Sequence, residues 1–371
     1  MVHAPERLPI TLDNTSYFIE VTSYSRTTIP VLREQRDTST EAGEQQLNTQ
    51  MWIRSQTDWS YGSGQEFFDN QDSDRRRFHT SAGIDPWTKG QVSLLPITED
   101  KGNTGNNVIM KVFVGPSDTY MYVSNGTALY YSVNFDVASP SWTSVTDNIG
   151  AITDFDSDGT SVFVVDGSAK IDKGALGATS LTSMTSSNLG AAKIRVISGR
   201  LIEMDGVHVA ELAASGAHLS SSLDYDLKHG SSWVDAAAGP AGVYLASNTN
   251  DVGSVHFCGT DADGLLNQPA QVADLPKGET INAIESYGGL LVFATNKGFR
   301  FASMQEAGGI LYGPLVSDTG AIYSAATDDR FVWLGAGGGQ VYRADLSKFT
   351  ESLVPAYASD LVSSISATAT D

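Results

Sequence analysis

The chain has 371 residues, of which 23 are lysine or arginine and 43 are aspartate or glutamate, so its formal net charge at pH 7 is −20. This acidity argues against nucleic acid or an anionic membrane as the main partner, because binding to such surfaces begins with clustered Lys and Arg. One cysteine excludes an intrachain disulfide. No apolar run approaches the roughly 18 residues of a membrane span, and the first nine residues hold no apolar signal-peptide core.

Residues 1–108 contain no internal repeat and no amphipathic helix pattern. Four short apolar or β-branched runs predict strands, and polar, loop-like sequence separates them. These runs are Ile10–Leu12, Tyr17–Val21, Thr28–Leu32 and Val92–Ile97. We therefore expect an extended, irregular N-terminal segment with short strands.

From residue 109 to residue 371 the sequence repeats. Each unit has a short apolar strand, a turn with Gly or Asp, a strongly apolar triplet, a turn with Gly or Asn, and a third strand. The units begin near residues 110, 152, 194, 234, 281 and 322. A period near 40 with three or four strands is typical of a β-propeller blade. The sequence therefore predicts an all-β fold with a propeller over 109–371; the alternative is a large β-sandwich with regular hairpins.

Two irregularities in the repeat carry further predictions. The step from the fourth unit to the fifth is the longest, which predicts an elongated loop at Asp261–Gln268. Near residue 365 the pattern starts again, since Ile365–Asp371 lines up with Ile322–Asp328. The propeller is therefore expected to have six to seven blades. Either the N-terminal part completes a seventh blade, with Val92–Ile97 the best candidate and the option we favour, or the natural polypeptide continues past Asp371.

A run of acidic residues in the second unit suggests a cation site. Asp154, Asp156 and Asp158, followed by Gly159, match the first half of a calcium-binding loop. The twelfth position of such a loop is Val165 rather than Glu. An ordinary acidic hairpin turn is therefore the alternative to a calcium site, and we expect no other cofactor.

Motifs of catalysis are missing from the sequence. There is no GxSxG nucleophile elbow, no phosphate-binding loop and no HExxH zinc motif. Acidic residues are plentiful, so their presence alone does not identify the paired carboxylates of a glycosidase. These observations predict that the protein is not an enzyme.

The N-terminal part carries a resemblance to a known family. It contains Trp59, Gly62–Gln65, Arg77 and Phe78, Ser81–Trp87 and Leu94–Pro96. Two further motifs, Leu32–Asp37 and Trp52–Arg54, precede these. In this order the motifs resemble those of minor tail proteins of long-tailed, siphovirus-type phages that infect actinobacteria. The resemblance implies a structural protein of the virion tail tip, assembled in the host cytoplasm and present in several copies or as a homo-oligomer. It also implies docking to other phage tail proteins through the N-terminal segment and display of a propeller for contact with the host surface.

Five aromatic residues are the predicted interface anchors of the docking segment, because buried aromatic side chains contribute most of the energy at interfaces. They are Trp52, Trp59, Phe67, Phe68 and Trp87. The alternative is that these side chains pack internally. Two other functions are weighed against the structural one: a propeller that binds or cleaves host cell-wall polysaccharide, and an intracellular scaffold.

Overall fold

The structure is a computed structural model. It describes residues 109–349 apart from 146–150, 167–169, 185–192, 214, 218, 220–221 and 329, together with a strand at 355–359. Before residue 109 it describes six strands, Trp59 and Gly62. The chain divides into two compact units, one formed by Met1–Leu95 with Ala356–Asp360 and the other by Pro96–Pro355 with Leu361–Asp371.

The N-terminal part contains a four-stranded antiparallel sheet. Its strands are β1 (Arg7–Leu12), β2 (Thr15–Glu20), β3 (Thr28–Leu32) and β4 (Met51–Ser55), paired in that order. Three of them overlap runs predicted as strands, whereas no strand was predicted for Met51–Ser55. Its apolar and aromatic residues, Met51, Trp52 and Ile53, pair with β3, and such residues favour strands. The segment is therefore more regular than its composition indicated.

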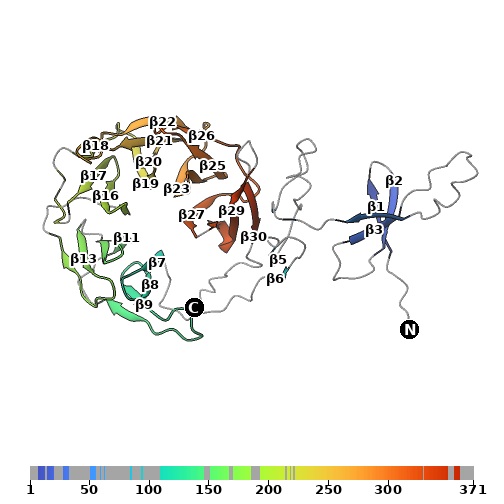
Figure 1. The fold of residues 1–371 in the computed structure, drawn as a ribbon, viewed down its shortest axis with the longest axis horizontal. Helices are drawn as coiled ribbons and strands as arrows, with labels where there is room; N and C mark the ends of the chain where they lie inside the picture. The colour runs from blue at the N-terminus through green and yellow to red at the C-terminus, as the bar shows by residue number, and fades with distance from the viewer. Residues whose placement is uncertain are drawn as a thin grey trace, which may run out of the picture. The chain divides into compact units, whose positions relative to one another are not determined.

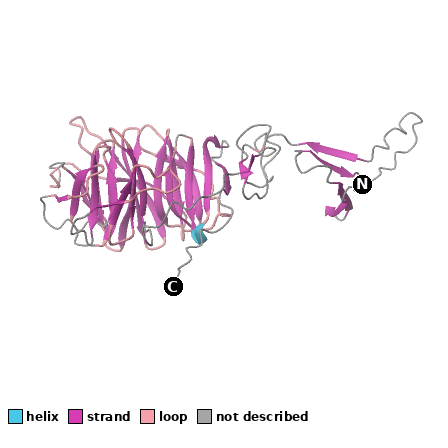
Figure 2. Cartoon of the chain, turned by 90° about the horizontal axis from the view of Figure 1, so that it is seen from below, coloured by secondary structure: helices cyan, strands magenta, loops and turns pink. Residues whose placement is uncertain are grey.

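Between residues 109 and 359, six four-stranded antiparallel sheets follow one another around a common axis (Figure 1). Seen from the side, their strands run alongside one another and loops cover both rims (Figure 2). The blades, in chain order from the innermost strand outward, are β7 (Ile109–Val114), β8 (Thr119–Ser124), β9 (Leu129–Ser132) and β10 (Thr143–Val145); β11 (Ile152–Ser157), β12 (Ser161–Asp166), β13 (Ile171–Ala175) and β14 (Thr182–Ser183); β15 (Lys193–Ile197), β16 (Arg200–Asp205), β17 (His208–Leu212) and β18 (Asp224–Asp226); β19 (Ser231–Gly239), β20 (Gly242–Thr249), β21 (Val252–Gly259) and β22 (Ala270–Asp274); β23 (Ile281–Tyr287), β24 (Leu290–Thr295), β25 (Gly298–Met304) and β26 (Ile310–Tyr312); β27 (Ile322–Thr327), β28 (Phe331–Ala336), β29 (Val341–Phe349) and β30 (Pro355–Ser359).

The repeat predicted from the sequence is confirmed. The innermost strands begin at residues 109, 152, 193, 231, 281 and 322, each within three residues of the predicted start. The apolar triplets form the second strands, and those of the middle blades are buried along almost their whole length, as in β24. Neighbouring blades cover both faces of these strands, which explains why the strands lack polar alternation.

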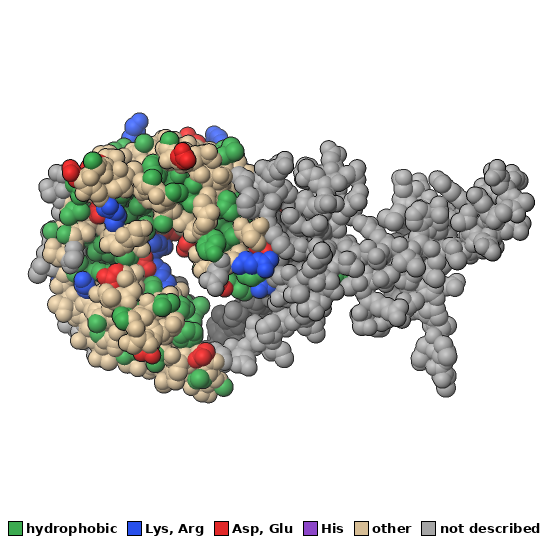
Figure 3. Space-filling model, viewed as in Figure 1, with side chains coloured by type: hydrophobic (Ala, Val, Ile, Leu, Met, Phe, Trp, Pro, Cys, Tyr) green, Lys and Arg blue, Asp and Glu red, His purple; other side chains and the backbone are tan. Residues whose placement is uncertain are grey.

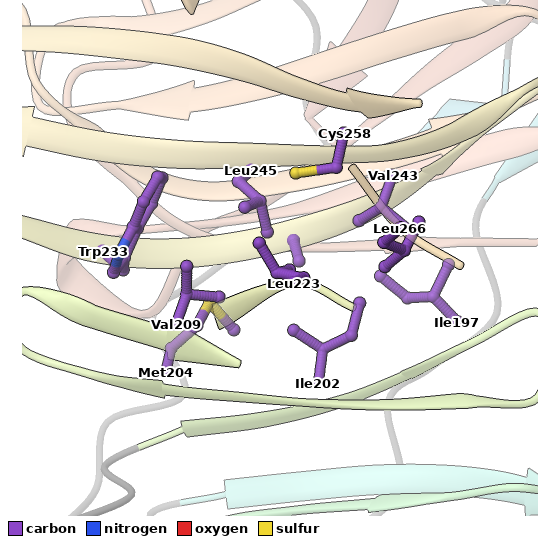
Figure 4. Close-up of a cluster of buried hydrophobic side chains, with 11 residues drawn as sticks. Ile197, Ile202, Met204, Val209, Leu223, Trp233, Val243, Leu245, Cys258 and Leu266 are labelled. Atoms are coloured by element: carbon purple, nitrogen blue, oxygen red, sulfur yellow. The ribbon is translucent and has the colours of Figure 1, made fainter. Parts of the chain in front are cut away.

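Apolar side chains fill the spaces between neighbouring blades. Figure 4 shows the cluster between the third and fourth blades, where Ile202 and Met204 face Trp233 and Leu245. Leu266, from the predicted insertion between β21 and β22, also lies in this cluster and is buried. The insertion therefore contributes to the core between two blades.

A β-bulge recurs in the innermost strands. The register between first and second strands shifts after Ile152, Trp233, Ile281 and Ile322. One extra residue at each bulge re-aims the side chains that follow it. This places the next residues of the strand, Asp154 and Asp235 among them, at the seams between blades.

The first and sixth blades do not meet as the other neighbours do. Innermost strands contact each other in sequence from β7 to β27, but β27 and β7 make no comparable contact in the described part of the chain. The run Val92–Ile97 does not supply a blade strand: Ser93–Leu94 forms β6, which pairs with β5 (Ile84–Asp85) in a separate two-stranded sheet. Residues 365–371 lie outside the described residues. The described part of the chain therefore has six blades.

No helix among the described residues is long and apolar enough to span a membrane.

Candidate functional site

Charged side chains line the axis of the propeller. Figure 3 shows blue and red side chains around the hollow at the centre of the ring. The innermost strands of the first five blades supply them: Lys111, Asp154, Asp156, Arg195, Asp235 and Glu285. We call these six residues the axial cluster.

Asp154 joins three blades. Its Oδ1 accepts a hydrogen bond from Lys111 Nζ of the first blade at 3.0 Å, and its Oδ2 accepts one from Arg195 Nη1 of the third at 2.7 Å. The backbone N–H of Ile194 also donates to Oδ2 at 3.2 Å. Only 7% of the Asp154 side chain is exposed. This carboxylate therefore holds the first three innermost strands together.

Arg195 continues the series to the fourth blade. Its Nε lies 2.7 Å from Oδ1 of Asp235, whose side chain is 4% exposed. Asp235 Oδ2 accepts a hydrogen bond from the backbone N–H of Ile284 in the fifth blade at 3.3 Å. Asp154 and Asp235 occupy the same place after a bulge and accept the same kind of backbone hydrogen bond from the following blade.

The pKa values of the acids differ with their surroundings. Burial disfavours the charged form of Asp154, but Arg195 and Lys111 outweigh it and hold its pKa below the ordinary value. Burial raises the pKa of Asp156, although Lys111 and a hydrogen bond from Val196 oppose the rise. Burial, together with the negative charge of Asp235, raises the pKa of Glu285 to about 7. Glu285 therefore exchanges its proton near neutral pH.

This arrangement sets limits on the chemistry of the axis. General acid catalysis needs a carboxyl group that is protonated at working pH and a second group that acts as base or nucleophile. Glu285 meets the first requirement. Asp154 and Asp235 are engaged in ion pairs and backbone hydrogen bonds, which hold their side chains in position.

The three residues of the suggested calcium loop are not arranged as metal ligands. Asp154 and Asp156 lie on β11 and face neighbouring blades, where Asp156 accepts a hydrogen bond from Val196 N at 2.8 Å. Asp158 lies in the following turn and accepts hydrogen bonds from the backbone N–H groups of Thr160 and Ser161. No group of three acidic, His or Cys side chains in the described part of the chain is placed to hold a metal ion. The alternating acidic pattern is explained by the strand and its turn.

The predicted interface anchors are only partly visible. Trp59 is half-buried, and its carbonyl accepts a hydrogen bond from Gly62 N at 2.8 Å, as expected of a tight turn. Trp52 lies on β4. Phe67, Phe68 and Trp87 lie outside the described residues, and for Trp52 only the backbone is described. The docking role of these residues remains a prediction.

Sequence reasoning missed Lys111, Arg195, Asp235 and Glu285. A signal was present, because each is a charged residue inside a short strand in which most of the other residues are apolar or small. A charge in a strand covered on both faces needs a partner. The ion pairs between blades could not be predicted from the sequence, because the paired residues lie about one repeat apart along the chain.

Comparison with known proteins finds no matching family model and no curated relative. Among solved structures, a catalytically inactive variant of virginiamycin B lyase from Staphylococcus aureus with quinupristin is 13% identical, with a TM-score of 0.53, covering 71% of this chain and 88% of that one. A streptogramin B lyase is 14% identical, with a TM-score of 0.50 and coverages of 70% and 86%. YCF48 bound to a D1 peptide is 13% identical, with a TM-score of 0.50 and coverages of 69% and 82%. At these identities the likeness shows the β-propeller fold alone.

Proposed function

We propose that this chain is a structural protein of a phage tail tip, which docks to other tail proteins through its N-terminal part and displays the propeller towards the host surface. The observation that carries the non-catalytic part of this proposal is the use of the axial charges. Asp154, Arg195 and Asp235 join neighbouring blades through ion pairs and backbone hydrogen bonds.

Three further observations support the phage assignment. The motifs from Leu32 to Pro96 resemble those of minor tail proteins. Strands β1 to β6 and the first five blades fall in two separate compact units, as a docking part and a displayed part would. The net charge of −20 agrees with a partner that is neither nucleic acid nor an anionic membrane.

The test is the location of the protein in an assembled particle. Antibodies raised against the purified chain, followed by gold labelling of negatively stained particles of the phage that encodes it, should mark the tip of the tail. Mass spectrometry of the same purified particles should find the chain. Its absence from purified particles, or labelling confined to the capsid, would overturn the proposal.

A second function, cleavage of a cell-wall polysaccharide, is favoured by one observation. Glu285 has a pKa raised to about 7 beside the carboxylate of Asp235, which suits a general acid. Its test is the release of reducing ends or unsaturated products from actinobacterial cell-wall polysaccharide by the purified protein. Activity lost in Glu285→Gln but kept in the neighbouring Ser286→Ala would support cleavage. If the wild-type protein releases no product, the cleavage proposal is contradicted, and the structural role of the axial residues stands.

A further inference from the structure

The carboxyl group of Glu285 differs from the other acids of the axial cluster in its partners. The carboxylates of Asp154 and Asp235 form ion pairs with Arg195. Asp156 accepts a hydrogen bond from a backbone N–H group of the third blade at 2.8 Å. Within the described part of the chain, no hydrogen bond or ion pair engages the side chain of Glu285. Its ionised form therefore lacks the compensation that a buried charge needs.

Charged groups of four other blades face Glu285 across the axis. They are Lys111 on β7, Asp156 on β11, Arg195 on β15 and Asp235 on β19. With Asp154 ionised as well, the two cations and three aspartates carry a net charge of −1, and an ionised Glu285 makes it −2. Of the other strands packed against β23, β20, β24 and β27 carry no charged residue, and their titratable residues are Tyr244 and Tyr323. The charge of an ionised Glu285 is therefore in excess at the axis.

The seam between the fourth and fifth blades is where this excess charge acts. β19 and β23 lie side by side at the axis (Figure 1). A hydrogen bond that joins them there, from Ile284 N to Asp235 Oδ2, is 3.3 Å long and lies next to Glu285 in the chain. Asp235 shares its cation, Arg195, with Asp154. An ionised Glu285 therefore adds a second carboxylate at a seam whose counter-charge is already divided, and like charges repel.

Away from the axis, apolar packing holds the same seam together. Ala237 and Ala246 of the fourth blade and Ile284, Leu291 and Phe293 of the fifth belong to one buried cluster. Their burial involves no ionisable group, so its contribution does not change between acid and neutral pH. Repulsion at the axis therefore loosens the inner ends of β19 and β23 while the two blades stay in contact.

We propose that Glu285 is a proton-operated latch on the inner end of the seam between the fourth and fifth blades. With its proton, the carboxyl group adds no charge to the axis, and the inner ends of β19 and β23 are closed. Without the proton, Glu285 and Asp235 repel each other, and the inner ends separate and admit water. Burial, followed by the charge of Asp235, raises the pKa of Glu285 to about 7, so the latch changes state near neutral pH. This latch is independent of the proposed function of the protein.

The experiment is amide hydrogen exchange of the full chain at about pH 5 and about pH 8, with each rate divided by the intrinsic rate at that pH. Because the pKa of Glu285 is raised above its ordinary value of 4.5, the closed seam loses stability as the pH rises. The protection of β19 and β23 in the wild type should therefore fall by more than about tenfold. Low concentrations of urea should not change this fall, because a local opening exposes little surface.

Two variants separate Glu285 from the other acids of the chain. Glu285→Gln cannot ionise and should keep the protection of β19 and β23 at both pH values. Glu306→Gln is the matched control, because Glu306 is exposed in the turn between β25 and β26 of the same blade. It should show the same fall in protection as the wild type.

Each outcome decides the proposal. A fall in the protection of β19 and β23 that is insensitive to urea and absent from Glu285→Gln supports the latch. Unchanged protection of the wild type between the two pH values overturns it, as does an equal fall in Glu285→Gln. A fall that grows with urea shows that the ring unfolds as a whole, which also overturns a local latch. If Glu285→Gln does not fold, the wild-type measurements decide alone, because the urea dependence needs no variant.

Discussion

Replacing Arg195 by Met removes a side chain that ties the second, third and fourth blades together at the axis. Its guanidinium lies 2.7 Å from Asp154 and 2.7 Å from Asp235, and 20% of the side chain is exposed. Methionine keeps much of the length and the apolar stem. The substitution therefore tests the charge rather than the packing.

The magnitude follows from what the two carboxylates keep. Asp154 retains Lys111 at 3.0 Å. Asp235 retains two backbone hydrogen bonds, from Ala236 N at 3.0 Å and Ile284 N at 3.3 Å, but loses its counter-charge. Removing one partner of a buried ion pair destabilises a protein by about 3–5 kcal/mol. We expect a loss of this size, which lowers the melting temperature of the propeller by roughly 10 °C.

The effect depends on pH with a definite sign. Because the pKa of Asp154 in the folded protein is held below its ordinary value of 3.8, its ion pairs stabilise the fold at neutral pH and are lost as the pH falls through the folded pKa. The free energies of unfolding of the wild type and Arg195→Met should therefore differ most near pH 7. They should converge as the pH falls below 3.8, the ordinary value.

The assay is urea unfolding, followed by tryptophan fluorescence at several pH values. Lys193→Met is the matched control, because Lys193 lies on the same strand and forms no ion pair in the described part of the chain. It should cost less than about 1 kcal/mol, as most surface charges do. Equal urea midpoints for Arg195→Met and the wild type at pH 7 would refute a stabilising role for the axial ion pairs.

Three further substitutions test separate parts of the fold. Glu285→Gln should flatten the pH dependence of stability. The pKa of Glu285 is about 7, above the ordinary 4.5, so the wild type loses up to roughly 3 kcal/mol of stability as the pH rises from 4.5 to 7, whereas the variant does not. Parallel curves of unfolding free energy against pH would contradict this. In thermal unfolding, Gly298→Ala should cost more than about 3 kcal/mol, because φ is +147° and a Cβ would lie 1.8 Å from Val316 O. The control Gly199→Ala, where φ is +78° and the space is open, should cost about 1 kcal/mol in the same assay. Tyr122→Phe removes the acceptor of a 2.8 Å hydrogen bond from Gly177 N between the first two blades and should cost about 1 kcal/mol in urea unfolding; no change would mean that water replaces the hydroxyl.

The propeller could be predicted because each repeat unit has the same local sequence pattern of apolar strands and turn residues. Triplets such as Val243–Leu245 are apolar on both faces, and a turn with Gly or Asn follows each of them. These features recur near every fortieth residue, so the blade starts could be placed within three residues. The elongated loop at Asp261–Gln268 was found from the same register.

The axial cluster could not be predicted, because its geometry depends on the β-bulges. Asp154 and Asp156 read as a loop when only their spacing is considered. In the structure a bulge after Ile152 turns Asp154 to the seam, where Lys111 and Arg195 meet it. A bulge depends on how two strands pair, and neither strand alone specifies it. The carboxylates suggested as calcium ligands instead accept hydrogen bonds within the strand, its turn and the neighbouring blade.

In the N-terminal part, strands with a clear local pattern were predicted, and one strand without such a pattern was missed. Ile10–Leu12, Tyr17–Val21 and Thr28–Leu32 were found from β-branched and aromatic content. Met51–Ser55 was missed, because polar sequence precedes it and no periodic partner marks it. Pairing with β3 through the register Val31 to Trp52 is a long-range choice, and such choices override local propensity.

The seams of the propeller make a linear series, and this determines how damage spreads. In a structure in which each unit contacts only its neighbours, stability is a sum of units and interfaces. Arg195 acts at two consecutive interfaces in the middle of the series. Its loss weakens the link between the first two blades and the last three, so the two parts can unfold at different urea concentrations. The seam between the sixth and first blades lies at the ends of the series, where Met110, Val112 and Val114 are exposed. A broadened or two-step transition is therefore the mark of a broken middle seam, while faster exchange limited to the terminal blades is the mark of an open end.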